Sequence, residues 1–210
     1  MKKRNKFNLS HYRLVSGNAG NLIPVSHFEV IPGDTIQHQP SVLLRAQALL
    51  APVMHRYTVR LHSFFVPFRL LHDEWEDFIT GQGGSLPTID LSTKGWGSGA
   101  GVIATSSLPD YLGIPTGDYS GGTTADNTVT SWPLLAYNRI YNEFYRDQDL
   151  VTEVSPGSGD IQKVAWGKDY FTAARPFAQK GSAITLPIGN SAPVVGSAPV
   201  YGDVGTPGRS

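Results

Sequence analysis

The sequence contains no cysteine, and this absence excludes a disulfide framework and any cysteine-based metal or redox site. No apolar run approaches the roughly 20 residues that a membrane-spanning helix requires, so we expect no membrane partner. Charged residues make up 16% of the 210 residues, whereas about 25% is usual in soluble domains. Because a freely diffusing enzyme normally carries more charge, this composition favours a protein whose surface is covered by neighbouring subunits.

Glycine and proline, by contrast, are abundant, with 23 and 15 copies. The chain also has 9 Phe, 9 Tyr and 4 Trp, which are too many aromatic side chains for a chain that is disordered throughout. Its length and its hydrophobic content of 40% suffice for one large domain or two small ones. Little charge and frequent turn residues together predict a mainly β protein with long loops.

The formal net charge of zero hides an uneven distribution of basic residues. Lys2, Lys3, Arg4 and Lys6 place four of the 17 positive charges within the first six residues. Such an arm is either a solvated terminus or a segment that binds nucleic-acid phosphates, and both interpretations are open. These four residues are the candidate nucleic-acid-binding residues.

The clearest strand signal lies at residues 55–66. Tyr57, Val59 and Leu61 alternate there with polar residues, which is the period-two pattern of a half-buried strand. A turn is predicted at residues 31–34, where proline presets one backbone angle and glycine can supply a positive φ. Further strands are expected at 25–30, 35–39, 41–50 and 183–186.

A first helix is predicted directly after Asp73 and Glu74. Trp75, Phe78 and Ile79 share one of its faces, and Gly81 stands where a left-handed cap ends a helix. We expect this apolar face to pack against strand residues.

A second helix is predicted to begin at Ser131, with Pro133 in its first turn. Its expected apolar stripe consists of Leu134, Tyr137, Ile140 or Tyr141, and Phe144, whereas Asn138, Asn142 and Arg146 lie off the stripe. The strand and helix patterns together give the following candidate core or interface residues: Tyr57, Val59, Leu61, Trp75, Phe78, Ile79, Tyr137 and Phe144.

Residues 81–131 differ in composition from the rest of the chain, because half of them are Gly, Ser or Thr. A long segment of this kind is uncommon inside a compact domain. We expect an insertion loop that buries too little apolar area to form a domain alone and is ordered mainly by neighbouring subunits. One short helical turn is predicted within it, at 108–112.

The residue types that carry catalysis do not form a convincing arrangement. The sequence has neither a phosphate-binding loop nor the nucleophile elbow of hydrolases. Its six histidines lack the spacing of a metal site, and the one close pair of carboxylates, Asp73 and Asp77, lies on an exposed helical face. We therefore expect no catalytic residue, no metal, no cofactor and no enzymatic activity.

Nine segments, in order along the chain, resemble one family of proteins. The most specific is DEWEDFITG at 73–81, and EVIPGDT at 29–35 is another. The remaining matches lie at 7–11, 22–25, 50–55, 64–71, 109–115, 136–147, and 169–172 with 179–181. In this pattern the sequence is similar to the major capsid proteins of the Microviridae, particularly those of the gokushovirus-like branch.

This resemblance implies a mainly β fold, the viral jelly-roll barrel, with long loop insertions and two short helices. It implies a virion protein that self-assembles into a small T=1 icosahedral shell around circular single-stranded DNA, assembled in the bacterial host cytoplasm. Implied partners are other copies of the chain, the packaged DNA, a small basic DNA-binding virion protein and a pilot protein. Members of the family are longer, so we expect the barrel strands that this chain lacks to come from other polypeptide. Either the chain is a fragment, or the remaining half is carried as a separate polypeptide.

The expected organisation along the chain follows from these features. It comprises a basic N-terminal arm at 1–20, jelly-roll strands and the first helix at 21–80, the insertion loop at 81–131, the second helix and a return to the barrel at 132–188, and an extended or mobile tail at 189–210. The alternative hypothesis is a soluble jelly-roll module that binds a carbohydrate or another ligand, because many such modules share this architecture. A monomer with saturable sugar binding would favour that alternative.

Overall fold

The hydrophobic core lies in the middle of the chain, between Ile89 and Tyr141. The structure is a computed structural model that describes residues 5–94, 96, 99–122, 127–165 and 167–175. The chain divides into one unit that ends at Gly167 and a second that begins at Lys168. In the second unit, the Asp169 carboxylate accepts hydrogen bonds from the backbone amides of Phe171 and Thr172, which closes a local turn.

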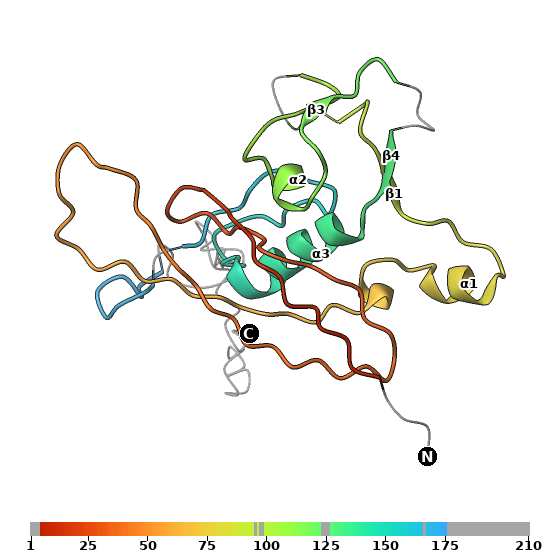
Figure 1. Cartoon of the computed structure of the whole chain (residues 1–210), viewed down its shortest axis with the longest axis horizontal. Helices are drawn as coiled ribbons and strands as arrows, with labels where there is room; N and C mark the ends of the chain where they lie inside the picture. Colours follow the sequence, from red (N-terminus) through yellow and green to blue (C-terminus); the bar gives the residue numbers. More distant parts are fainter. Residues whose placement is uncertain (1–4, 95, 97–98, 123–126, 166, 176–210) are drawn as a thin grey trace, which may run out of the picture. The chain divides into compact units, whose positions relative to one another are not determined.

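Two small antiparallel sheets flank this core. Strand β1 (Thr88–Asp90) pairs with β4 (Thr128–Thr130), and β2 (Val102–Ile103) pairs with β3 (Gly117–Asp118) (Figure 1). Ile89 is buried between its two more exposed neighbours in β1, as the alternation of side chains along a strand requires. Gly101 precedes β2 with a φ of +79°, and a Cβ atom there would lie 2.7 Å from the backbone nitrogen of Ser120. Both the positive φ and this close approach require glycine.

The helices are short and follow local signals in the sequence. They are η1 (Phe68–Leu70), α1 (Trp75–Thr80), α2 (Leu108–Tyr111) and α3 (Trp132–Ile140), and α3 continues directly into the π-helical turn η2 (Tyr141–Tyr145). Gly81 ends α1 in the left-handed conformation, as predicted. The expected helical turn at 108–112 and the expected start of the second helix after Ser131 are also confirmed.

Helix α1 is attached to the start of α3 by aromatic rings. The Phe68 ring lies 4.8 Å from Trp75 and 4.6 Å from Trp132 between centroids, and Trp75 lies 5.7 Å from Trp132. Trp75 and Phe78 are half-buried in this arrangement, whereas Ile79 is 63% exposed. The prediction that Ile79 packs beneath the helix against strand residues is therefore wrong for this chain, because the helix packs on Trp132 instead.

The glycine-, serine- and threonine-rich segment 81–131 supplies a large share of the core. Ile89, Leu91, Ile103, Leu108 and Leu112 form one hydrophobic cluster with residues of α3. Because this cluster includes Leu134 and Tyr137 of α3, the expectation that the segment cannot form a domain alone stays a prediction. Its few apolar residues occupy the inward positions of β1, β2 and α2, whereas its small residues form the turns. Its placement relative to a barrel stays a prediction.

The segments expected as strands in the first part of the chain form no ladder. Within the described residues, 25–30, 35–39, 41–50 and 55–66 carry no strand, and none of them is buried. Apolar and polar residues do alternate in 55–66, but a strand also requires hydrogen bonds to the backbone of a partner strand. No backbone group of the described residues pairs with this segment. The turn at 31–34 does form, with the Asp34 amide 3.0 Å from the Ile31 carbonyl. The expected strand at 183–186 and the tail at 189–210 lie outside the described residues.

Candidate assembly surface

The first part of the chain carries an unusual amount of exposed apolar surface. Twenty-one of the thirty large hydrophobic side chains that are exposed in the described residues lie between Phe7 and Phe65. We call residues 7–65 the apolar segment. Tyr57, Val59 and Leu61, expected in a core or an interface, are 53%, 52% and 40% exposed. Monomeric proteins rarely expose apolar patches larger than a few hundred Å², so this segment is the candidate functional surface.

Hydrogen bonds made by Arg13 and Tyr111 connect the start of the apolar segment to the core. The Arg13 guanidinium donates to the carbonyl of Val25, at 2.9 Å, and to the carbonyl of Tyr111. The Tyr111 hydroxyl donates in return to the carbonyl of Ser16, at 2.5 Å. These hydrogen bonds satisfy backbone carbonyls and hold the start of the apolar segment in place, although it pairs in no β-ladder.

The phenol of Tyr137 in α3 makes a second attachment. Its hydroxyl donates to the carbonyl of Leu22 at 2.8 Å and accepts from the amide of Gln162 at 2.9 Å. The same two residues are joined directly, because the Leu22 amide donates to the Gln162 carbonyl at 2.9 Å. Tyr137 is buried, as expected for a core residue, and this burial raises the pKa of its phenol to about 12.

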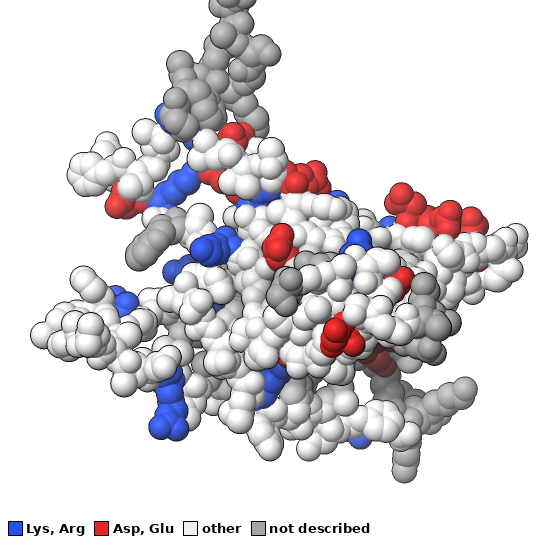
Figure 2. All heavy atoms as spheres, turned by 90° about the horizontal axis from the view of Figure 1, so that it is seen from above, with Lys and Arg blue, Asp and Glu red and all other residues white. Residues whose placement is uncertain are grey.

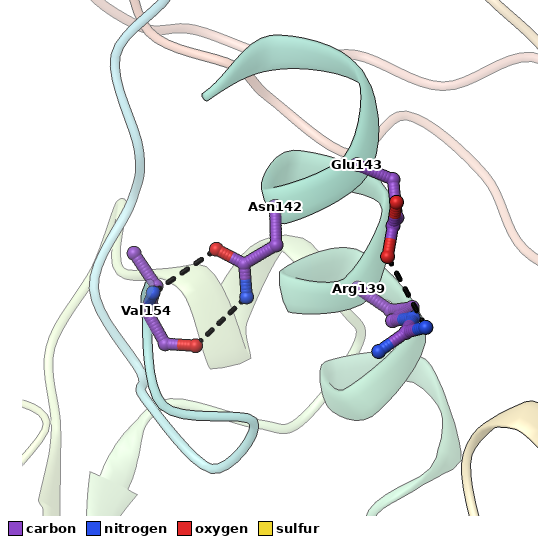
Figure 3. Close-up of polar contacts among 4 residues, drawn as sticks. All are labelled: Arg139, Asn142, Glu143 and Val154. Carbon is purple, nitrogen blue, oxygen red and sulfur yellow. Dashed lines mark hydrogen bonds and ion pairs between the residues drawn. The ribbon is translucent and has the colours of Figure 1, made fainter. Parts of the chain in front are cut away.

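Two asparagines on α3 hold the loop that follows the helix. The Asn142 amide donates to the Val154 carbonyl at 2.8 Å and accepts from the Val154 amide at 3.0 Å (Figure 3). One turn earlier, Asn138 donates to the carbonyls of Pro156 and Ser158, at 2.7 and 2.8 Å. Both side chains are buried, although they lie off the predicted apolar stripe. Their amides provide hydrogen-bond partners for the backbone of a loop that forms no ladder there.

The other face of the same helix is exposed. Arg139 forms an ion pair with Glu143 at 3.1 Å, with the two side chains about half exposed, and it points away from Val154 (Figure 3). A surface pair of this kind contributes little to stability. The buried asparagines, rather than the charged residues, therefore orient the loop.

The π-helical turn explains the position of Phe144. The Arg146 amide bonds to the carbonyl of Tyr141 five residues earlier, at 2.9 Å, so this turn contains one residue more than an α-helical turn. The extra residue rotates Phe144 off the predicted stripe, and its side chain is 68% exposed. Phe144 is therefore not part of this chain's core, and its role in an interface stays a prediction.

Phe144 and Tyr145 meet the end of the apolar segment at an open hollow. The hollow has a volume of about 400 Å³ and is lined by His62, Ser63, Phe64, Phe144 and Tyr145. The Phe64 and Phe144 rings lie 4.8 Å apart at a tilt of 44°, and the His62 ring stacks on Tyr145 with centroids 5.8 Å apart. The Tyr145 hydroxyl lies 2.5 Å from His62 Nδ1, and burial raises the pKa of this phenol above its ordinary value. We call these residues the aromatic hollow.

A charge pattern around the hollow escaped the sequence-based predictions. Residues 35–72 contain four Arg and four His but no Asp or Glu. The next carboxylates along the chain belong to the acidic start of α1, and Figure 2 shows acidic side chains gathered at the right of the view, with other charged side chains scattered over the rest of this face. A count of charge sign in windows along the sequence would have found this acid-free segment, which we define as residues 35–72.

The predicted basic arm is described only in part. Lys2, Lys3 and Arg4 lie outside the described residues, and Lys6 is exposed. The assignment of these four residues to nucleic-acid binding stays a prediction. Among the residues that were searched, no group of three His, Asp or Glu could hold a metal ion. No helix in the described part of the chain is both long and apolar enough to span a bilayer.

Comparison with known proteins gives a consistent result. The chain is 35% identical to capsid protein VP1 of Bdellovibrio phage phiMH2K, over 98% of this chain and 40% of that protein. It is 32% identical to capsid protein VP1 of Chlamydia phage 1, over 95% of this chain and 37% of that protein. It is 28% identical to capsid protein VP1 of Spiroplasma virus 4, over 91% of this chain and 37% of that protein. The chain thus spans about two-fifths of the length of these relatives.

A family model also matches nearly the whole sequence. The family is described as capsid protein (F protein), and the match covers residues 1–209. The resemblance expected from the nine ordered segments is thereby confirmed. The chain belongs to the capsid protein (F protein) family.

Proposed function

We propose that this chain is a structural part of a phage capsid that assembles with other copies into a T=1 icosahedral shell and catalyses no reaction. The observation that carries the proposal is the apolar segment, in which twenty-one large hydrophobic side chains between Phe7 and Phe65 are exposed in the described chain. Each such side chain contributes about 1.5–3 kcal/mol when it is fully buried. Obligate interfaces between subunits have this composition, resembling a core cut in two, and closed point-group symmetry buries the same surface on every copy.

The jelly-roll barrel belongs to the same proposal. Residues 55–66 form neither helix nor strand, their apolar side chains alternate with polar ones, and their backbone groups offer an unpaired edge. Such edges recruit strands from other polypeptide. We infer that residues 25–30, 35–39, 41–50 and 55–66 become barrel strands when polypeptide beyond the described residues pairs with them. This pairing would also cover Tyr57, Val59 and Leu61.

The implied partners follow from a shell that encloses a genome. Lys2, Lys3, Arg4 and Lys6 would face the packaged circular single-stranded DNA and contact its phosphates without reading its bases. A small basic virion protein and a pilot protein would be further components, and assembly would take place in the cytoplasm of the bacterial host. The four clustered positive charges support the contact with DNA.

The size of the purified protein tests this proposal. Electron microscopy and sedimentation of the chain, co-expressed with the polypeptide that completes its barrel, are expected to reveal closed particles of megadalton mass. Leu50→Asp, which places a charge on a fully exposed position of the apolar segment, should abolish the particles and leave the protection of core amides in 89–91 unchanged. Phe171→Asp, at an exposed position outside the segment, is the matched control and should leave assembly intact. A discrete monomer that binds sugar saturably would instead favour the ligand-binding module.

A further inference from the structure

The acid-free segment carries several exposed positive charges. Arg45, Arg56, Arg60 and Arg69 are all exposed. The ion pair between Arg139 and Glu143 involves none of them. Within residues 35–72 there is no carboxylate that could neutralise them. A segment that carries several cations and no acidic residue of its own favours contact with a polyanion.

The aromatic hollow lies in the same segment and exposes the faces of aromatic rings. Phe144 is 68% exposed and Phe64 is 37% exposed. Their tilt of 44° prevents the two rings from covering one another completely. The hydrogen bond between His62 and Tyr145 holds the extended chain against η2, so the rings keep this arrangement. Exposed rings on a fixed backbone offer a stacking platform for a planar group.

Cations and rings are close enough to act together on one ligand. Arg60 precedes His62 by two residues, which corresponds to at most about 7 Å of extended chain. Arg56 precedes Arg60 by four residues, at most about 14 Å. A cationic track beside exposed aromatic rings is the arrangement that binds single-stranded nucleic acid without sequence preference, with phosphates on the cations and bases on the rings.

We propose that the acid-free segment and the aromatic hollow form a binding site for single-stranded nucleic acid, in which a base stacks on Phe64 and Phe144 and the flanking phosphates contact Arg56 and Arg60. A duplex does not fit this site, because its bases remain stacked on one another and cannot reach the rings. The site is separate from the N-terminal basic arm. This proposal rests on the proposed function only in assuming that the chain is part of a shell that encloses a genome.

Photochemical cross-linking locates the contact directly. Assembled full-chain protein is incubated with fluorescein-labelled oligothymidylate, irradiated, digested and analysed by mass spectrometry. Cross-linked peptides are expected to contain residues 62–64 or 144–145. Parallel samples with oligouridylate and with duplex DNA identify the kind of nucleic acid that binds. Tighter binding of oligothymidylate than of oligouridylate indicates a site for single-stranded DNA. Equal binding of the two indicates a site for single-stranded DNA or RNA. Cross-links confined to the N-terminal arm, or equal binding of duplex, would overturn the proposal.

Variants separate stacking from charge. Phe144→Ala should weaken binding of oligothymidylate about five- to 150-fold, the range for loss of one stacked base, and Phe144→Tyr should restore it. Phe171→Ala, at an exposed phenylalanine outside the hollow, is the matched control. The double variant Arg56→Gln with Arg60→Gln should reduce the slope of log affinity against log salt by about 1.4, whereas Lys94→Gln, at an exposed cation outside the segment, should not change it.

The outcome also distinguishes this site from a contact between subunits. If Phe144→Ala prevents assembly while oligothymidylate binding per subunit stays unchanged, the hollow is a subunit contact and the proposal is wrong. If the wild-type chain forms no particles but Phe144→Ala still loses binding, the binding site stands and the shell function fails.

Discussion

The hydroxyl of Tyr137 donates a hydrogen bond of 2.8 Å to the carbonyl of Leu22, a residue 115 positions earlier in the chain. Tyr137 belongs to the buried face of α3, whereas Leu22 lies within the apolar segment. The same hydroxyl accepts from the amide of Gln162. One buried phenol therefore joins three distant parts of the chain, and it couples the core to the surface that we propose for assembly.

Replacing Tyr137 by phenylalanine should loosen this attachment. The substitution keeps the ring but leaves the Leu22 carbonyl and the Gln162 amide without their partner, which costs about 1–3 kcal/mol in the free energy of unfolding. Hydrogen exchange should speed up at residues 20–22 and 162–164, while amides of the β1–β4 ladder keep their protection. Tyr141→Phe alters a buried tyrosine of the same helix and serves as the control. Equal effects of the two substitutions would contradict the proposed role of the phenol.

The pKa of Tyr137 predicts a loss of stability in alkaline solution. In the folded chain this pKa is raised from 10.0 to about 12. Below about pH 10 both the folded and the unfolded chain keep the proton, so the contribution to stability is complete. Between about pH 10 and 12 the unfolded chain loses the proton first, and the free energy of unfolding falls as pH rises. Urea midpoints measured across this range should fall less steeply in Tyr137→Phe than in the wild type or in Tyr141→Phe.

Asn142 should be worth more to stability than the ion pair on the opposite face of its helix. Asn142→Ala removes both hydrogen bonds to the backbone of Val154 and should lower the free energy of unfolding by about 1–3 kcal/mol. Glu143→Ala breaks the exposed pair with Arg139 and should cost about 0.3–0.5 kcal/mol, as is usual for helix pairs of this spacing. Urea denaturation of the two variants gives the comparison. A larger cost for Glu143→Ala would show that the loop does not depend on the asparagine.

The parts of the fold that follow from local signals could be predicted from the sequence. Helix α1 ends at Gly81 and α3 begins after Ser131 because a left-handed cap and a proline in the first turn act on the backbone nearby. The burial of Tyr137 followed from the helical period in the same way. These features need no knowledge of distant residues.

The misassigned residues depend on contacts that the pattern does not contain. Asn138 and Asn142 lie off the predicted apolar stripe and yet are buried, because an irregular loop beside the helix needs their amides. Phe144 was misplaced because the π-helical turn changes the helical period. Residues 55–66 have the alternation of a strand, but pairing depends on a partner that alternation cannot identify. The acid-free segment, in contrast, was present in the sequence and required only a count of charge sign.

Hydrogen exchange can test whether that missing partner arrives on assembly. In the isolated chain, backbone amides of 56–65 should exchange rapidly, because no described backbone group pairs with them. Amides of the β1–β4 ladder, where Ile89 lies opposite Val129, should be protected in the same sample and serve as the internal control. In assembled particles the amides of 56–65 should gain protection, since strand pairing withdraws them from water, while those of the ladder change little. Rapid exchange at 56–65 in intact particles would show that this segment remains unpaired, and the barrel would then have to be built without it.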